Sequence, residues 1–234
     1  MARHIGIVGC SAEGAALCYR TICMEAPQLM GPHAHPEVTM HTPSLAHYVA
    51  CLARNDLAGV GELMLSSARK LANVGADFLI CPDNTIHQAF EYVAPRSPLP
   101  WLHIAEVVTA HAASCGFRQV GLVGTRWLVE SAVYPEKLTA QGIACVIPQL
   151  AERVEIDRII MQELVAGITK AEGVSYFQNV IKQMKAEGCD AVVLGCTEIP
   201  LIIDDENAAL PTLDSTRLLA RAALQYAVDD IHKL

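Results

Sequence analysis

The chain has 234 residues, a formal net charge of -8 and a hydrophobic content of 52%. This length permits one large domain or two of roughly 100–120 residues each, and the hydrophobic content excludes a disordered chain. The acidic balance argues against a nucleic-acid partner. No apolar run reaches the ~18 residues that a membrane span needs, so we expect no membrane partner either.

The nine cysteines are odd in number and show no regular disulfide spacing. Such usage is typical of reduced thiols and predicts a cytoplasmic protein. No Cys-x-x-Cys pair occurs, so the sequence predicts no metal site of the usual spacing. The N-terminus runs directly into an apolar strand-like stretch without a cleavage site, and we therefore expect no signal peptide.

Apolar runs and helical spacing alternate through the first half of the chain. Prolines and glycines in residues 24–36 predict a loop, and small residues in 10–14 predict a turn that offers backbone N–H groups to an anion. The expected strands are 4–9, 37–42, 77–81 and 101–104. The expected helices are 15–23, 56–72 and 106–115, and residues 82–87 are expected to form a turn that leads into a further helix.

The same pattern begins again near residue 119. The expected strands are 119–125, 144–148, 191–195 and 210–214, and the expected helices are 126–141, 156–168, 175–187 and 216–231. Strands that alternate with helices predict an α/β fold with parallel sheets.

Two segments repeat in the same order and at nearly the same spacing. Residues 5–9 match 120–124, and residues 75–80 match 188–193. This ordered pair of matches predicts two similar α/β lobes, each a parallel sheet flanked by helices. We expect residues 1–102 with 214–234 to form the first lobe and 103–213 to form the second.

Cys196 follows a buried strand directly, and ligands of open α/β sheets bind at that end of the strands. A helix is expected to begin after it, with N–H groups that favour the thiolate. When the second repeat is carried forward, Asp83 takes the position that corresponds to Cys196. Two such groups facing one small molecule suit general acid–base catalysis. The structural alternatives are a buried inert thiol and an aspartate that only caps a turn.

At this point the motifs resemble those of the aspartate/glutamate racemase superfamily, and most closely its aspartate racemase branch. The matching segments are Ile5–Gly9, Asn84-Thr85-Ile86-His87, Gly121–Thr125 and Gly195-Cys196-Thr197-Glu198. The resemblance implies two similar α/β lobes related by a pseudo-two-fold axis with the site between them, no cofactor, no metal and a homodimer. It also implies two cysteines that act on opposite faces of the amino acid α-carbon. The second of these is Cys196, and the position of the first is held here by Asp83.

The resemblance further implies which residues hold the carboxylate and amine of a small carboxylate or amino acid substrate: Cys10, Ser11, Asn84, Thr85, Thr125 and Thr197. Cys81 is a candidate assisting residue. We therefore expect a cofactor-independent amino acid racemase, an isomerase, with Asp83 and Cys196 as an asymmetric catalytic pair. The alternatives are a related decarboxylase, a cis–trans isomerase of small dicarboxylates, and a binding protein without catalytic activity.

Overall fold

The computed structural model describes residues 2–229, so the end of the last expected helix, residues 230–231, lies outside the described part. The chain divides into two compact units. The first comprises Met1–Val107 with Thr216–Leu234, and the second comprises Val108–Ser215. The lobe boundaries expected from the sequence stay a prediction, and the two units are described one at a time.

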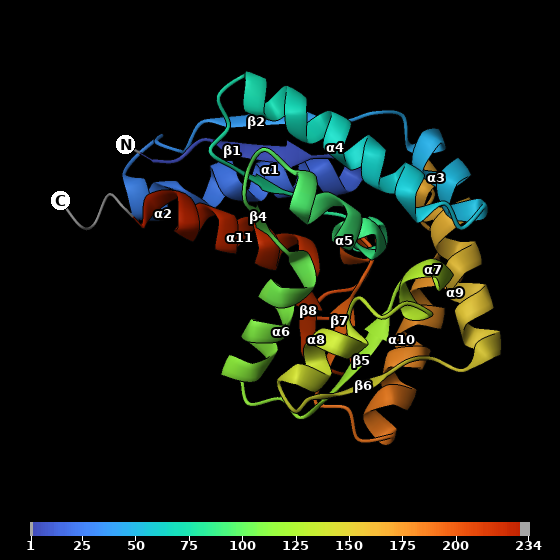
Figure 1. The fold of residues 1–234 in the computed structure, drawn as a ribbon. Helices are drawn as coiled ribbons and strands as arrows, with labels where there is room; N and C mark the ends of the chain where they lie inside the picture. Colours follow the sequence, from blue (N-terminus) through green and yellow to red (C-terminus); the bar gives the residue numbers. More distant parts are fainter. Residues whose placement is uncertain (1, 230–234) are drawn as a thin grey trace. The chain divides into compact units, whose positions relative to one another are not determined.

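The first unit is built on a four-stranded parallel sheet with the order β2-β1-β3-β4 (Figure 1). The strands are β1 (Ile5–Val8), β2 (Val38–His41), β3 (Phe78–Ile80) and β4 (Trp101–Leu102). β1 and β3 are fully buried, which is the pattern of central strands covered on both faces.

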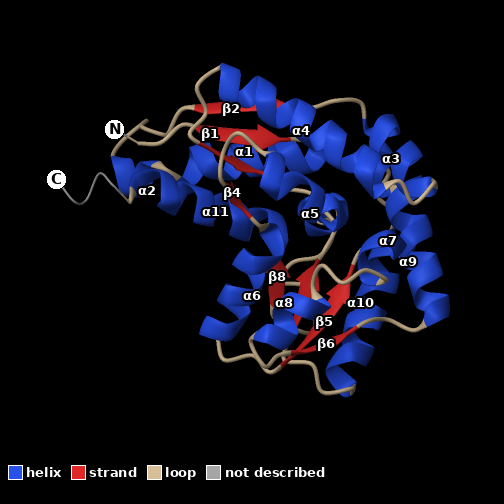
Figure 2. Cartoon of the chain, viewed as in Figure 1, coloured by secondary structure: helices blue, strands red, loops and turns tan. Residues whose placement is uncertain are grey.

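Helices cover both faces of this sheet (Figure 2). On one face, the apolar side chains of β1 and β3 pack against α1 and α11 around Ile5, Ile22 and Leu219. On the other face lies α4, whose Leu71 approaches Gly6. The helices are α1 (Ala12–Glu25), α2 (Pro27–Met30), α3 (Leu45–Ala53), α4 (Leu57–Asn73), η1 (Thr85–Ala89), α5 (Phe90–Val93), η2 (Ala94–Arg96) and α11 (Ser215–Val228). α6 (Ile104–Ser114) begins in this unit and continues into the second.

Two short helices in the first unit were not expected. The segment expected to be a loop contains α2, which begins at Pro27, because proline is well suited to the first turn of a helix. The chain after β2 forms α3, which starts after Ser44. Its two buried residues, Tyr48 and Leu52, are four positions apart, as on one face of a helix, but nine residues are fewer than the window in which helical spacing is recognised.

The second unit has a four-stranded parallel sheet of equivalent order, β6-β5-β7-β8. Its core lies between β5, β7, α9 and α10. The strands are β5 (Gln119–Val123), β6 (Ala144–Val146), β7 (Ala191–Leu194) and β8 (Thr212–Asp214), and the helices are α7 (Arg126–Val129), α8 (Pro135–Ala140), α9 (Leu150–Gln162), η3 (Leu164–Ala166), α10 (Ala171–Ala186) and η4 (Ile199–Leu201).

Three expected helices of the second unit were wrong in extent. The helix expected at 156–168 begins earlier, as α9 at Leu150, and ends at Gln162, before the separate 3-10 turn η3. The long helix expected up to residue 141 is two short ones, α7 and α8, and the second begins at Pro135. The helix expected after Cys196 is the single 3-10 turn η4. Thr197 and Glu198 therefore do not open an α-helix, and the thiol of Cys196 does not lie at an α-helix N-terminus.

The common topology of the two units extends to how the first strand of each is anchored. In the first unit, an Asp77 carboxylate oxygen accepts the N–H of His4 at 2.7 Å. In the second unit, an Asp190 carboxylate oxygen accepts the N–H groups of Arg118 and Gln119 at 2.7 and 3.1 Å. Asp77 and Asp190 occupy matching places in the repeated segments, so the duplicated α/β architecture predicted from the sequence is confirmed.

Within residues 2–229, none of the helices combines the length and the apolar character needed to cross a membrane.

Candidate active site

The expected site residues lie at the carboxyl ends of the two central strands of each sheet. Connections leave these strands in opposite directions, and such a switch point is where open α/β sheets bind ligands. We call the turns after β1 and β3 the first half-site and the turns after β5 and β7 the second half-site. The first contains Cys10, Ser11, Cys81, Asp83, Asn84 and Thr85, and the second contains Thr125, Cys196 and Thr197.

Exposure separates the two expected catalytic residues from their neighbours. Residues 78–87 are all buried except Asp83, which is partly exposed. Residues 191–200 are all buried except Cys196, which is also partly exposed. A functional group must be reachable to act on a substrate, so each half-site offers one accessible ionisable side chain at the same place in the duplicated sheet.

In the first half-site, hydrogen bonds fix the turns that carry these residues. The Ser11 hydroxyl accepts the N–H of Gly14 at 3.2 Å and caps α1. Asp83 Oδ1 accepts the N–H of Ile86 at 3.1 Å, so this carboxylate also caps η1. Asn84 and Thr85 are buried directly behind it. Asp83 therefore has the capping role that the sequence allowed as an alternative, and it is also partly exposed.

A buried thiol and a buried imidazole support the Asp83 turn from inside. Burial, with a smaller contribution from the Asp83 charge, raises the pKa of the Cys81 thiol well above its ordinary value, so Cys81 stays protonated at neutral pH. The Cys81 sulfur lies 4.0 Å from the Asp83 carbonyl oxygen. An assisting role for Cys81 stays a prediction, and this environment suits a proton donor rather than a base.

His87 Nδ1 lies 2.6 Å from the same Asp83 carbonyl oxygen, and His87 Nε2 accepts the N–H of Ile104 at 3.5 Å. An imidazole with one donating and one accepting nitrogen is neutral. Burial, followed by the neighbouring His103, lowers the pKa of His87 to about 3. His87 is thus a fixed neutral support for the turn that carries Asp83.

In the second half-site, the backbones after β5 and β7 approach each other closely. The N–H of Gly195 donates to the Val123 carbonyl at 2.7 Å, and a Cβ atom on Gly195 would lie 2.8 Å from that oxygen. Only glycine fits such a contact. Thr125 follows and caps α7 by accepting the N–H of Leu128 at 3.3 Å.

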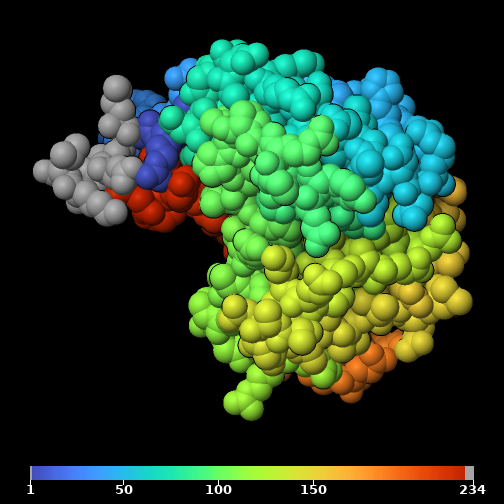
Figure 3. Space-filling view, in the orientation of Figure 1, coloured from blue at the N-terminus to red at the C-terminus, as the bar shows by residue number. Residues whose placement is uncertain are grey.

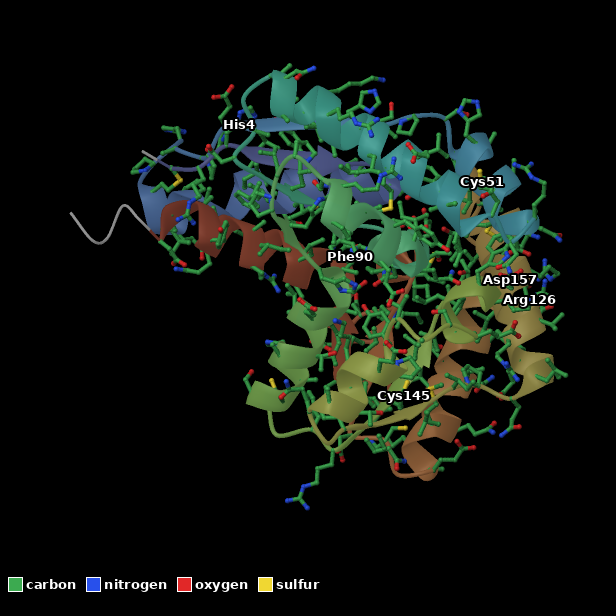
Figure 4. All side chains as sticks on the ribbon, in the orientation of Figure 1. His4, Cys51, Phe90, Arg126, Cys145 and Asp157 are labelled. Atoms are coloured by element: carbon green, nitrogen blue, oxygen red, sulfur yellow. The ribbon has the colours of Figure 1, made fainter. Side chains whose placement is uncertain are left out.

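The turn after Thr125 is also held from α9. Asp157 Oδ1 accepts the N–H of Arg126 at 2.8 Å. Arg126 and Asp157 lie beside each other in the second unit (Figure 4). The position of Thr125 is therefore set by bonds on both sides of the turn.

Cys196 has a specific partner that the sequence reasoning did not assign. Its thiol donates to Glu198 Oε2 at 2.9 Å, and the Thr197 hydroxyl donates to the same oxygen at 2.8 Å. Glu198 is 2% exposed. A buried carboxylate that accepts from a partly exposed thiol orients that thiol and can take up its proton. The Gly-Cys-Thr-Glu motif contained this residue, but the expected helix assigned Glu198 to a first helical turn.

No cluster of three or more histidine, cysteine or acidic side chains that could hold a metal ion occurs within the part of the chain that the structure describes. The two half-sites instead supply a carboxylate, a thiol with a carboxylate partner, and several buried hydroxyl and amide groups. Such a set of groups can move protons and bind an anion.

Comparison with known proteins agrees with this inventory. A model of the Asp/Glu/Hydantoin racemase family matches residues 5–223. A provisionally assigned Asp/Glu racemase from Yersinia pestis is 28% identical in sequence, and the match covers 97% of this chain and 99% of that one with a TM-score of 0.87. An aspartate racemase homologue from Pyrococcus horikoshii OT3 is 25% identical, with the same coverage and a TM-score of 0.82.

Among curated sequences, the broad specificity amino-acid racemase RacX of Bacillus subtilis is 23% identical over 166 residues, which is 70% of either chain. Glutamate racemase 3 of Caldanaerobacter subterraneus is 30% identical over 146 residues, covering 60% of this chain and 49% of that protein. These relatives are named as racemases, which are isomerases. Because the family model spans nearly the whole chain and the fold matches throughout, this protein belongs to the Asp/Glu/Hydantoin racemase family.

Proposed function

We propose that this member of the racemase family inverts the α-carbon of a small amino acid of the aspartate or glutamate type without a cofactor, using Asp83 and Cys196 as the two proton-transferring groups. One observation carries this assignment. At the same point of the duplicated sheet, each unit has a single partly exposed residue in an otherwise buried stretch, and these residues are Asp83 and Cys196.

The chemistry of the two groups assigns them different resting roles. An ordinary carboxyl group titrates near ~4 and an ordinary thiol near ~8.5, so at neutral pH the first is a base and the second an acid. The Cys196 thiol donates a hydrogen bond to Glu198, as a protonated thiol does. In the direction for which the resting enzyme is ready, Asp83 removes the α-proton from one face and Cys196 returns a proton to the other.

Removal of the α-proton leaves negative charge on the substrate carboxylate, and donors aimed at that charge lower the barrier. Cys10, Ser11, Asn84, Thr85, Thr125 and Thr197 are the groups that we assign to holding the substrate. Ser11 and Thr125 support this assignment, because each is fixed as the cap of the first helix after the first strand of its unit. Side chains that are already fixed lose little further conformational entropy when they bind the substrate.

A second function is favoured by one specific contact. Asp83 Oδ1 already accepts the N–H of Ile86, so this carboxylate has a structural task that does not require it to be a base. An enzyme that relies on Cys196 alone could protonate one face of the carbanion that loss of CO2 from a small dicarboxylate leaves, or its thiolate could add to a double bond and leave again after rotation, which is a cis–trans isomerisation. A binding protein without catalytic activity is the remaining alternative.

The test is solvent exchange combined with chiral analysis. The protein is incubated in D2O with each enantiomer of aspartate and glutamate, and NMR follows the α-proton while chiral chromatography follows inversion. The proposal expects deuterium at the α-carbon together with the opposite enantiomer. Release of CO2 from a malonate, or conversion of maleate, would assign the second function. Thermal stabilisation by these acids without turnover would assign a binding protein.

We also propose that the protein works as a cytoplasmic homodimer. The resemblance to the racemase superfamily supports the dimer, and the nine cysteines without regular disulfide spacing support a reducing compartment. Sedimentation equilibrium of the purified protein tests the first part, since a monomer across the working concentration range would contradict it. Fractionation of cells expressing the tagged chain tests the second.

A further inference from the structure

A groove of about 280 Å³ lies between two helices of the first unit. It is lined by side chains of α1 and by one side chain of α11: Leu17, Arg20, Thr21, Met24, Glu25 and Arg217. Both helices cover the same face of the sheet, where they pack around Ile22 and Leu219, and α11, coloured red, reaches the surface of the first unit (Figure 3). None of the lining residues belongs to either half-site.

Three arginines gather at this groove, although the chain as a whole has a net charge of -8. Arg221 is paired, because its Nε and Nη2 donate to the two carboxylate oxygens of Glu25 at 2.8 and 2.9 Å. Arg20 is exposed, and its guanidinium has no ion-pair partner among residues 2–229. Since both oxygens of Glu25 are engaged by Arg221, this carboxylate does not balance the charges of Arg20 and Arg217.

The arrangement of these arginines is unfavourable as long as the groove is empty of an anion. Arg20 and Arg217 are like charges that line one groove and repel each other. Arg217 and Arg221 lie four positions apart on α11, and a like-charge pair at this spacing destabilises a helix. A groove that only packed two helices together would not need these charges, and local conflicts of this kind are typical of functional sites.

The lining supplies both donors and apolar surface. Each guanidinium is planar and offers N–H groups in a fork that matches two oxygens of a carboxylate or a phosphate. The Thr21 hydroxyl already donates to the Leu17 carbonyl at 2.8 Å, so the donors that remain for a ligand are those of the arginines. Leu17 and Met24 add apolar surface beside the charges, and Met24 is 68% exposed.

We propose that this groove is a binding site for a small organic anion, whose carboxylate or phosphate group lies between Arg20 and Arg217 and whose apolar part packs against Leu17 and Met24. The bound anion replaces the repulsion of the two arginines by charge-assisted hydrogen bonds, and it thereby ties α1 to α11. The site is separate from the two half-sites, and its existence does not depend on the proposed racemase activity.

The experiment measures anion binding by titration calorimetry and by thermal melts. The probes are inorganic phosphate, phenyl phosphate and benzoate, with neutral benzamide as the uncharged control. Phenyl phosphate or benzoate should bind more tightly than inorganic phosphate, because the apolar ring adds contact, and benzamide should not bind. The tighter of the two ring compounds identifies the anionic group that the site prefers. At ten times its Kd, this anion should raise the melting temperature of wild type by about 3–6 °C.

Arg20→Gln and Arg217→Gln should each weaken anion binding about 10-fold, because one charged donor is lost. The matched control is Arg69→Gln, which removes the same charge from an exposed position on α4, on the other face of the sheet, and should keep the wild-type Kd. Arg20→Glu places a carboxylate opposite Arg217. Without ligand this variant should melt about 1–3 °C higher than wild type, because repulsion becomes attraction, and added anion should no longer stabilise it.

Three results would overturn the proposal. The first is that none of the anions binds wild type. The second is that Arg20→Gln and Arg217→Gln bind anions as tightly as Arg69→Gln does, which would place the anions elsewhere, the half-sites included. The third is a change of oligomeric state in Arg20→Gln with an unchanged Kd for the anions, which would assign the groove to a contact between two copies of the chain.

Discussion

At the end of β3 the first unit carries Asp83, and at the corresponding end of β7 the second unit carries Cys196. The surroundings of these two residues differ in kind. Backbone groups and the neutral His87 hold the Asp83 turn, whereas a buried carboxylate accepts a hydrogen bond from the Cys196 thiol. The duplicated sheet thus fixes where each partly exposed ionisable side chain lies, and in our proposal the carboxylate rests as the base and the thiol as the acid.

The largest effect is expected when the acid is removed. Cys196→Ala leaves the second half-site without its thiol and should lower the rate of α-proton exchange and inversion by about 100- to 10,000-fold. Cys115→Ala is the control, because Cys115 is an exposed cysteine directly after α6 and its loss should leave the rate unchanged. Equal activity in both variants would remove the thiol from the mechanism.

Asp83→Asn separates the two tasks of Asp83, which are capping η1 and, in our proposal, acting as a base. The asparagine side-chain oxygen can still accept the N–H of Ile86, so the cap and the melting temperature should be retained, while the base is lost and inversion falls about 100- to 10,000-fold. Asp83→Ala, which loses both, should in addition be less stable by about 0.5–2 kcal/mol. If Asp83→Asn inverts substrate at the wild-type rate, Asp83 is only a cap.

Asp83→Cys would make the two half-sites alike. With a thiol at the end of both central strands, the pair matches the two-cysteine arrangement of the racemase superfamily. Inversion by this variant faster than by wild type would show that the native pair is adapted to a neighbouring reaction. A slower variant would show that the carboxylate is the better base in this turn.

Glu198→Gln is expected to have a smaller effect. An amide oxygen can still accept the Cys196 thiol, so the orientation is retained, but the group can no longer take up the thiol proton. The rate should fall about 10- to 100-fold with an unchanged KM, because one proton acceptor next to the thiol is lost. Steady-state kinetics with wild type as reference measures this, and an unchanged kcat would assign Glu198 a packing role alone.

The last prediction concerns the pH dependence of stability and not the rate. The pKa of His87 is lowered from 6.5 to about 3 in the folded chain, so as the pH falls below 6.5 the unfolded chain binds a proton that the folded chain does not. The stabilisation is complete above pH 6.5 and is lost at about 1.4 kcal/mol per pH unit between pH 6.5 and 3. Urea unfolding of wild type and His87→Gln should show a flatter acid dependence in the variant. Parallel curves would contradict the neutral buried state.

The strands and the duplicated topology could be predicted from the sequence, because apolar runs bounded by glycine have a strong local signal. The positions of Asp83 and Cys196 at strand ends followed from the repeat. The partnership of Glu198 with Cys196 could not, because it depends on η4 being a short turn instead of a helix.

The most direct test of the central claim compares exchange with inversion in the same sample. Each aspartate and glutamate enantiomer is incubated in D2O with wild type, Asp83→Asn and Cys196→Ala, and both the α-deuterium content and the enantiomer ratio are followed. If Asp83 and Cys196 act on opposite faces of one α-carbon, wild type will exchange and invert, and both variants will lose inversion. Inversion at the wild-type rate by either variant would contradict the claim.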